Sequence, residues 1–219
     1  MRLRDRVGVT PRRQRQLTRA MQVVLVGIVF IGLDRGSAGI VVNGSLSLAV
    51  TYLPALLERD HDIPMDPAIT LWITSAVFLH AVGALGVPGS DVSFYRSVWW
   101  WDHLTHALSS SIVAAAGYAT ARAFDVHSDG VSLPPRFVFV FILLFVVAFG
   151  VAWEVLEFAL GRVAAAIGTG TVLTQYGLAD SMLDLVFDAL GGLVVAAWGH
   201  VHLTDVVHAL VERLDTRRA

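Results

Sequence analysis

The chain has 219 residues, of which 55% are hydrophobic, and its mean hydropathy is +0.65. Because the apolar residues lie in long blocks, this composition indicates an integral membrane protein and excludes an ordinary soluble domain. The formal net charge of -2 argues against nucleic-acid binding, and the absence of cysteine excludes disulfides, cysteine metal ligands and cysteine nucleophiles.

An arginine-rich segment, residues 1–19, precedes the first apolar run and holds seven arginines. We expect it to be a cytoplasmic segment that is disordered or lies on the membrane surface. The apolar run itself, residues 21–33, is short for a span, and the sequence GSAG after it could mark a signal-peptide cleavage site. We interpret the run as a retained first helix, because the arginine-rich segment is long for the charged region of a signal peptide.

Five further apolar segments are predicted to span the membrane. They cover about residues 36–57, 67–86, 102–121, 137–160 and 179–201. The glycine-rich loop 161–177 could partly re-enter the bundle. Beyond the last span, apolar residues recur at helical spacing, which predicts an amphipathic cytoplasmic tail over residues 202–219. The predicted fold class is therefore all-α: a polytopic membrane helix bundle of about six transmembrane helices, with residues 20–201 as its membrane region.

The distribution of arginines sets the expected orientation. With a cytoplasmic N-terminus, thirteen of the sixteen arginines fall in cytoplasmic segments, and three, Arg35, Arg96 and Arg162, fall outside. Because positively charged residues are enriched on the cytoplasmic side, this imbalance predicts that both termini are cytoplasmic. We expect a multi-pass protein of the plasma membrane, in direct contact with the lipid bilayer.

Three short stretches place ionisable residues inside predicted spans. They are WWWDHLTH at the start of the fourth span, WEVLE in the fifth and DSMLDLVFD in the sixth. The ionisable residues of each stretch that are three or four positions apart lie along one face of a helix. These residues are Asp102, His106, Glu154, Glu157, Asp180, Asp184 and Asp188.

The predicted topology brings the three sets to the same depth. The fourth and sixth spans enter from the outside and the fifth runs outward, so all of these residues lie in the outer part of the membrane. The acids of the sixth span lie within about 12 Å of its start. His80, in the third span, lies in the outer half by the same argument. We therefore expect the sets to face one another.

Several acids at one depth need a neutralising partner. An ionised acid at the bilayer centre costs about 2.5–3.5 kcal/mol, and no arginine lies in the interior of a predicted span. Protons, protonated histidines or a divalent metal ion could neutralise the acids. We favour a divalent metal ion, because carboxylates with one or two imidazoles suit Mn, Fe or Zn, and less well Mg and Ca.

This hypothesis assigns roles to individual residues. Glu157 and His80 are candidates for the general base, or for support behind the ligands. The predicted metal ligands are Asp102, His106, Glu154, Asp180, Asp184 and Asp188. Asp188 could instead contact the other ligands without binding the metal ion itself.

Structural explanations compete with this hypothesis for some residues. Asp102 and Asp180 lie at helix N-termini, where an acid can cap free backbone N–H groups. Glu157 could be hydrated at the membrane interface. His103 is one position from Asp102, so we expect it to point away from the other ionisable residues, toward the interface.

Four stretches of the chain carry a resemblance to a known family. They are FLHAVGA in the third span, WWWDHLTHALS in the fourth, WEVLEF in the fifth and QYGLADSMLDLVFDALGG leading into the sixth. Across about residues 40–195 the chain resembles the YjdF-like prokaryotic inner-membrane proteins. The resemblance implies a shared multi-spanning bundle and supplies no activity.

Three functions are compatible with these residues. We favour a metal-dependent hydrolase whose metal ion activates water or polarises a phosphoryl or carbonyl group of a lipid-borne substrate at the outer leaflet. The alternatives are a transporter that binds and releases protons or a small cation, and a non-catalytic membrane scaffold. The inner halves of the spans are nearly all Val, Leu, Ala and Phe, which favours a site open to one side over a path through the membrane.

Overall fold

The computed structural model describes residues 9–86, 92–128, 130–168, 170, 172–173 and 175–216, and of residues 200–202 only the backbone. Within these residues every regular element is a helix, which confirms the predicted all-α fold. The helices are α2 (Pro11–Asp34), α3 (Ala38–Val50), α4 (Leu53–His61), α5 (Pro67–Gly83), α6 (Phe94–Ser97), α7 (Trp101–His127), α8 (Pro135–Ile167), α9 (Leu178–His202) and α10 (Thr204–Thr216).

Local sequence signals explain where several helices begin and end. Pro11 opens α2 directly after Thr10, whose side chain accepts a hydrogen bond from a backbone N–H of the first turn. Asp66 caps α5 by accepting from two backbone N–H groups of its first turn, at 2.8 and 2.9 Å. α8 ends at Gly168, whose φ of 72° is the left-handed conformation that glycine adopts without strain.

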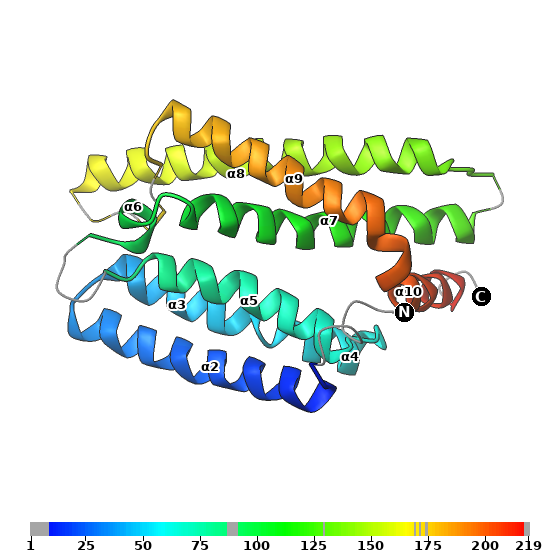
Figure 1. Cartoon of the computed structure of the whole chain (residues 1–219), viewed down its shortest axis with the longest axis horizontal. Helices are drawn as coiled ribbons and strands as arrows, with labels where there is room; N and C mark the ends of the chain where they lie inside the picture. The colour runs from blue at the N-terminus through cyan, green and yellow to red at the C-terminus, as the bar shows by residue number, and fades with distance from the viewer. Residues whose placement is uncertain are drawn as a thin grey trace.

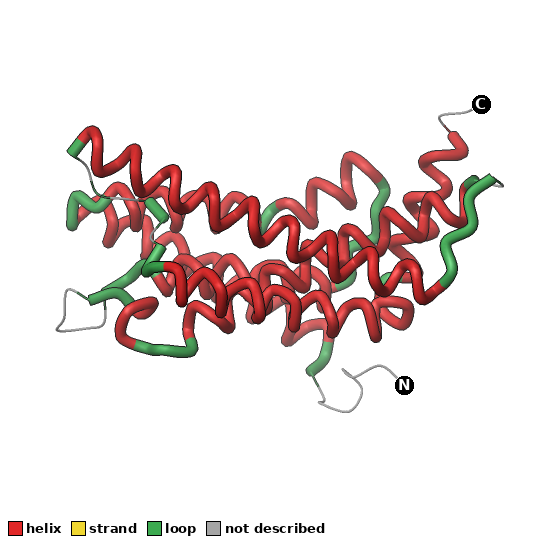
Figure 2. The backbone as a smooth tube through the Cα atoms, turned by 90° about the horizontal axis from the view of Figure 1, so that it is seen from above, coloured by secondary structure: helices red, strands yellow, loops and turns green. Residues whose placement is uncertain are grey.

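The long helices form two groups of three that run along a common axis (Figure 1). α2, α3 and α5 pack against one another, and α7, α8 and α9 do the same. The contact between α5 and α7 joins the two groups, and the most extensive helix contact in the molecule is the one between α7 and α9. Figure 2 shows the same helices from above, running side by side along the long axis.

Six parts of the bundle correspond to the six predicted spans. Four helical segments are long and apolar enough to cross a membrane, namely Pro11–Asp34, Ala38–His61, Pro135–Ile167 and Leu178–Gly199. The fifth part is α5, which is apolar but shorter. The sixth is α7, whose 27 residues include many buried polar side chains. Because α5, α8 and α9 pack around α7, it can be less apolar than a helix that faces lipid.

The first helix starts earlier than expected. α2 begins at Pro11 instead of Met21, because Thr10 and Pro11 form a helix start and arginine is a good helix former. Residues 11–19 are therefore helical, while the first eight residues of the predicted N-terminal segment lie outside the described residues. α2 belongs to the core of the bundle, since Leu25 is fully buried in a cluster with residues of α3 and α5.

Two other predicted spans differ from the helices observed. The second is divided into α3 and α4, because Pro54 has no N–H to donate to the helix that precedes it. α8 continues to Ile167, so the first part of the predicted loop 161–177 is helical. Further along this loop, the carbonyl of Val172 accepts a hydrogen bond from Asn43 Nδ2 at 2.8 Å, which ties the loop to α3.

The last helix, α10, packs against α7 and α9 at one end of the bundle. Arg213 Nη1 donates to the backbone oxygen of His61 at 2.7 Å, and His127 Nδ1 lies 2.5 Å from Asp215 Oδ1. The start of α2 lies at this end as well (Figure 1). Because the start of α2 and the helix α10 lie at the same end of the bundle, the chain crosses it an even number of times (Figure 1). That this end is cytoplasmic stays a prediction.

Candidate metal centre

The close contact between α7 and α9 brings acids and histidines together. Gly191 of α9 lies against the backbone of α7, where a Cβ would overlap the carbonyl oxygen of Ala107 and the hydroxyl of Ser110. Glycine therefore permits an approach that any larger side chain would prevent. Asp184 and Asp188 precede this glycine on α9, and both contact histidines of α7.

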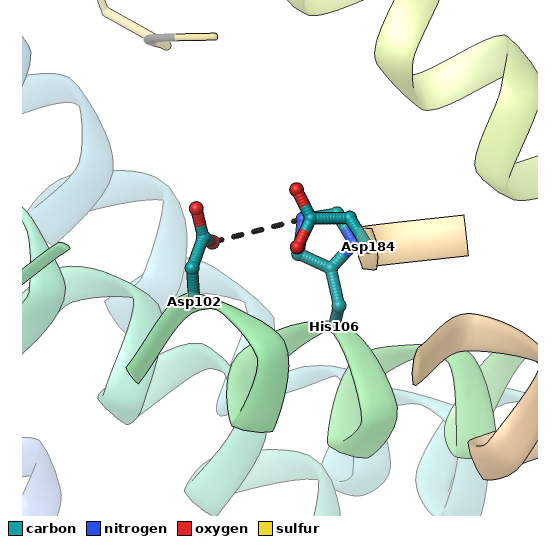
Figure 3. A group of neighbouring side chains, drawn as sticks. All are labelled: Asp102, His106 and Asp184. Atoms are coloured by element: carbon teal, nitrogen blue, oxygen red, sulfur yellow. Dashed lines mark ion pairs between the residues drawn. The ribbon is translucent and has the colours of Figure 1, made fainter. Parts of the chain in front are cut away.

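Three side chains at this contact lie within metal-binding range of one another (Figure 3). Asp102, His106 and Asp184 each offer one ligand atom, and these atoms all lie within 4.8 Å of one another. The Nε2 atom of His106 is 3.7 Å from Asp102 Oδ1. His106 and Asp184 are 6% and 2% exposed, and Asp102 is half-buried. The group combines residues from two helices, so it exists only when α7 and α9 are packed.

Each of the two buried aspartates of α9 holds a histidine of α7. His106 Nδ1 lies 3.3 Å from Asp188 Oδ1, and His103 Nδ1 lies 3.0 Å from Asp184 Oδ1. Because Asp188 occupies Nδ1 of His106, the Nε2 atom of that ring is the one available to an ion. Gly150 of α8 makes room for this arrangement, since a Cβ there would overlap the carboxylate of Asp188.

The prediction that His103 points toward the membrane interface is wrong. His103 is buried, contacts Asp184 and stacks on Phe187 with the ring centroids 4.8 Å apart. The prediction assumed that α7 has one inner face, but α5, α8, α9 and α10 all pack against this helix. A residue one position from Asp102 can therefore also point into protein.

The glutamates of α8 add two carboxylates to the same region. Glu154 is 7% exposed, and its Oε2 accepts from Gln175 Nε2 at 3.3 Å. Gln175 also donates to the hydroxyl of Ser181 at 2.8 Å. Within the described part of the chain, Glu154 Oε1 is buried and has no hydrogen-bond partner. Glu157 Oε1 accepts from Trp153 Nε1 at 3.1 Å, so its position is fixed by its own helix.

Neither α7 nor α9, for whose first turns capping by an aspartate was considered, has a side-chain cap. Asp180 Oδ2 accepts a hydrogen bond at 3.2 Å from the backbone N–H of Tyr176, just before α9 begins. Asp102 makes no such contact, because α7 begins at Trp101 and no side chain caps its first turn. Asp180 therefore holds the segment that precedes α9, and side-chain capping accounts for neither aspartate.

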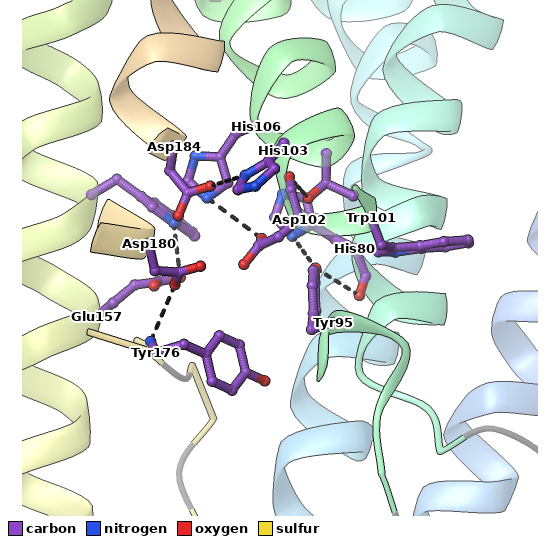
Figure 4. Close-up of polar contacts among 12 residues, drawn as sticks. His80, Tyr95, Trp101, Asp102, His103, His106, Glu157, Tyr176, Asp180 and Asp184 are labelled. Carbon is purple, nitrogen blue, oxygen red and sulfur yellow. Dashed lines mark hydrogen bonds and ion pairs between the residues drawn. The ribbon is translucent and has the colours of Figure 1, made fainter. Parts of the chain in front are cut away.

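His80 faces this region from α5 (Figure 4). Its Nδ1 lies 2.7 Å from the hydroxyl of Tyr95, which also donates to the backbone oxygen of His80 at 3.2 Å. Burial raises the pKa of the Tyr95 hydroxyl well above its ordinary value, so the hydroxyl stays protonated. Tyr95 belongs to the short helix α6, and it fixes the orientation of the His80 ring.

A cavity of about 330 Å³, here named the polar cavity, opens beside these side chains. Its wall includes His80, Tyr95, Asp102, Glu157 and Tyr176. The two predicted general-base candidates therefore face the same space as one of the predicted metal ligands.

The predicted site residues lie on α5, α7, α8 and α9. Figure 4 shows six of them close together, namely His80, Asp102, His106, Glu157, Asp180 and Asp184. The structure brings Asp102, His106 and Asp184 into one compact group with Asp188 directly beside it. The remaining four lie around this group on α5, α8 and α9, and their roles stay predictions. These four are His80, Glu154, Glu157 and Asp180.

Sequence reasoning missed several polar side chains that support the site. Tyr95 and Gln175 lie in the connections between long helices, where no helical period indicates which way a side chain points. Trp153 lies four positions before Glu157, a spacing that does place both on one face of a helix. That spacing is the one signal that could have identified a supporting residue in advance.

The comparison with protein families identifies a predicted membrane protein. Residues 17–205 match the family described as "Predicted membrane protein (DUF2238)". A Thermotoga maritima protein named "Uncharacterized protein" is 30% identical over 145 residues, which cover 66% of this chain and 68% of that protein. No solved structure matches the chain. The resemblance to YjdF-like proteins is compatible with these matches. Because the family match includes every helix that carries the site, we conclude that the chain belongs to the DUF2238 family of predicted membrane proteins.

Proposed function

We propose that this protein binds a divalent metal ion between α7 and α9, with Asp102, His106 and Asp184 as direct ligands. The observation that carries the proposal is the convergence of one imidazole nitrogen and two carboxylate oxygens within 4.8 Å. This mixed set of nitrogen and oxygen donors suits Mn, Fe or Zn. Metal ligands are usually held by a second layer of contacts, and here Asp188 holds His106 while His103 holds Asp184.

The charge of the surroundings also favours a cation. Six carboxylates are buried or half-buried near one end of the bundle, namely Asp102, Glu154, Glu157, Asp180, Asp184 and Asp188. In the part of the chain that the structure describes, none of them pairs with an arginine. Burying an ionised carboxylate without a counter-charge costs on the order of several kcal/mol of desolvation free energy. A divalent ion would offset two of these negative charges.

A metal ion at this position would support hydrolysis. It would activate a water molecule or polarise a phosphoryl or carbonyl group. Glu157 and His80 line the polar cavity together with Asp102, so either side chain is placed to accept a proton from a nucleophile bound there. We infer a lipid-borne substrate at the outer leaflet of the plasma membrane, because the arginine distribution predicts that this end of the bundle faces outside.

The test is the metal content of the purified full chain after incubation with Mn, Fe, Zn and Mg. We expect about one tightly held ion per chain in the wild type, and its loss in the double variant His106→Ala, Asp184→Asn. The double variant Asp62→Asn, His208→Ala is the matched control, because it changes the same residue types at exposed positions. The control should keep the metal ion.

Two results would refute the proposal. A wild-type protein without metal after all four incubations would exclude the metal centre, and equal metal in the two double variants would place it elsewhere. In the first case, flux in liposomes after a pH jump would identify a proton-coupled transporter. Loss of stability in the first double variant without any flux would instead identify a structural cluster.

A further inference from the structure

Two adjoining cavities with walls of different polarity lie beside the candidate metal centre. The first is the polar cavity. The second has a volume of about 460 Å³ and is here named the apolar cavity, because side chains such as Leu46, Val113 and Phe149 form most of its wall. The two cavities share four wall residues, which shows that they are neighbours. The shared residues are Asn43, His80, Val172 and Leu173.

The candidate metal centre lies at the boundary between these cavities. Asp102 lines the polar cavity, whereas His106 and Asp188 line the apolar cavity. A molecule bound across the boundary would therefore place the junction between its polar and apolar parts next to the proposed metal ligands.

The apolar cavity opens sideways, toward the lipid. It lies between the two helix groups, which α5 and α7 join on one side, while α3 and α8 make no extensive contact in the described residues. Leu46 of α3 and Phe149 and Leu156 of α8 belong to its wall, and they are 61%, 48% and 44% exposed. On a membrane-spanning bundle, exposed apolar side chains face hydrocarbon. A hydrocarbon chain can therefore enter the cavity between α3 and α8 from within the bilayer.

One arginine lies in the wall of the polar cavity, and a second lies beside a residue of that wall. Arg35 is part of its wall and forms no ion pair within the part of the chain described here. Arg96 lies with its Cζ atom 5.9 Å from the ring centroid of Tyr176, which also belongs to the wall. An arginine in the wall and a second one near it favour an anion in this cavity, and phosphate is a group that arginine binds with good geometry.

We propose that the two cavities together bind one anionic amphiphile, a lipid with a phosphate headgroup in the polar cavity and its hydrocarbon chain in the apolar cavity. This names the substrate class of the proposed hydrolase, and it rests on that function because a bound metal ion offsets carboxylates that would otherwise repel the phosphate. The headgroup then lies between Arg35 on one side and the metal ion on the other. A lipid without an anionic group would gain from neither charge, and a zwitterionic lipid would gain less because its cationic group is repelled.

The test is native mass spectrometry of the full chain in a neutral detergent with equal amounts of three lipids that carry the same acyl chains. The lipids are phosphatidic acid, phosphatidylcholine and a cationic trimethylammonium lipid. We expect preferential retention of phosphatidic acid, and a loss of about tenfold in Arg35→Gln, which corresponds to one charge-assisted hydrogen bond. Arg162→Gln is the matched control, because Arg162 is an exposed arginine of α8 outside the walls of both cavities.

A second variant tests the apolar cavity. Ser109→Leu adds volume to its wall and should weaken phosphatidic acid retention while the metal content stays unchanged. Thermal unfolding of each variant shows whether the bundle is intact, and Arg35→Gln tests the polar cavity separately, because Arg35 lies in the wall of that cavity and not in the wall of the apolar cavity.

Four results would overturn the inference. They are equal retention of all three lipids, preference for the cationic lipid, complete displacement by inorganic phosphate alone, and unchanged binding in Arg35→Gln. Metal content measured on the same samples separates the two proposals. Metal without a preference for phosphatidic acid would refute this inference alone, and Arg35-dependent binding of phosphatidic acid to a metal-free protein would refute the proposed function alone.

Discussion

Replacing Gly191 by alanine tests whether the close contact between α7 and α9 builds the metal centre. The new Cβ would overlap the carbonyl oxygen of Ala107 and lie 3.1 Å from its carbonyl carbon. Carbon atoms normally approach to about 3.5–4.0 Å, so α9 has to move away from α7 by roughly 0.5–1 Å. Because these atoms belong to the backbone, no side-chain rotation relieves the overlap.

The matched control is Gly27→Ala in α2, because nothing lies within 4 Å of the Cβ position at Gly27. Both variants gain the same helix propensity, about 0.5–1 kcal/mol, so the difference between them isolates the overlap. We expect the free energy of unfolding of the α9 variant to be lower by about 1–3 kcal/mol than that of the control. Equilibrium unfolding in mixed micelles of a mild and a denaturing detergent measures this difference.

Metal binding should respond as well. Asp184 lies on α9, and Asp102 and His106 lie on α7, so separating the helices pulls the three ligand atoms apart. We expect the metal affinity to fall by about 10- to 100-fold, the range found when the support of a metal ligand is disturbed. Equal unfolding free energies and equal metal affinities in the two glycine variants would refute this reasoning, because they would show that α7 and α9 tolerate a side chain between them.

Three further predictions concern the surroundings of the metal ligands. His103→Ala removes the partner of Asp184 and should lower the metal affinity by about 10- to 100-fold in a chelator competition, while an unchanged affinity would contradict a supporting role. Gly150→Ala should displace the carboxylate of Asp188 from His106 and speed metal release. The free energy of unfolding should fall by less than about 1.5 kcal/mol, because only a side chain must move. A much larger loss of stability would contradict this explanation. Lowering the pH from about 8 to about 5 should release the metal ion, because protons compete with it for the carboxylates and the imidazole. Elemental analysis of the protein after dialysis measures this release. A metal ion that is retained at about pH 5 would show that other groups hold it.

Helical periodicity and hydropathy predicted the parts of this protein that depend on one helix at a time. The spacing of four between Asp102 and His106, and again between Asp184 and Asp188, places each pair on one helix face, because an α-helix has 3.6 residues per turn. The alternating direction of successive spans then predicted that the acids lie at one depth. Figure 4 shows four of these acids close together, namely Asp102, Glu157, Asp180 and Asp184, although they come from three helices.

The sequence by itself thus determined an all-helical membrane bundle with acids and histidines at one end, since apolar blocks and residue spacing are local properties. Only the tertiary structure decided which of them meet. Gly191 and Gly150 could be recognised as small residues, but the sequence does not show that one admits α7 and the other admits the carboxylate of Asp188. His103 points inward because several helices surround α7, and Tyr95 reaches His80 from a connection without helical period. Distances between side chains of different helices depend on how closely those helices approach, and periodicity within one helix carries no information about that approach.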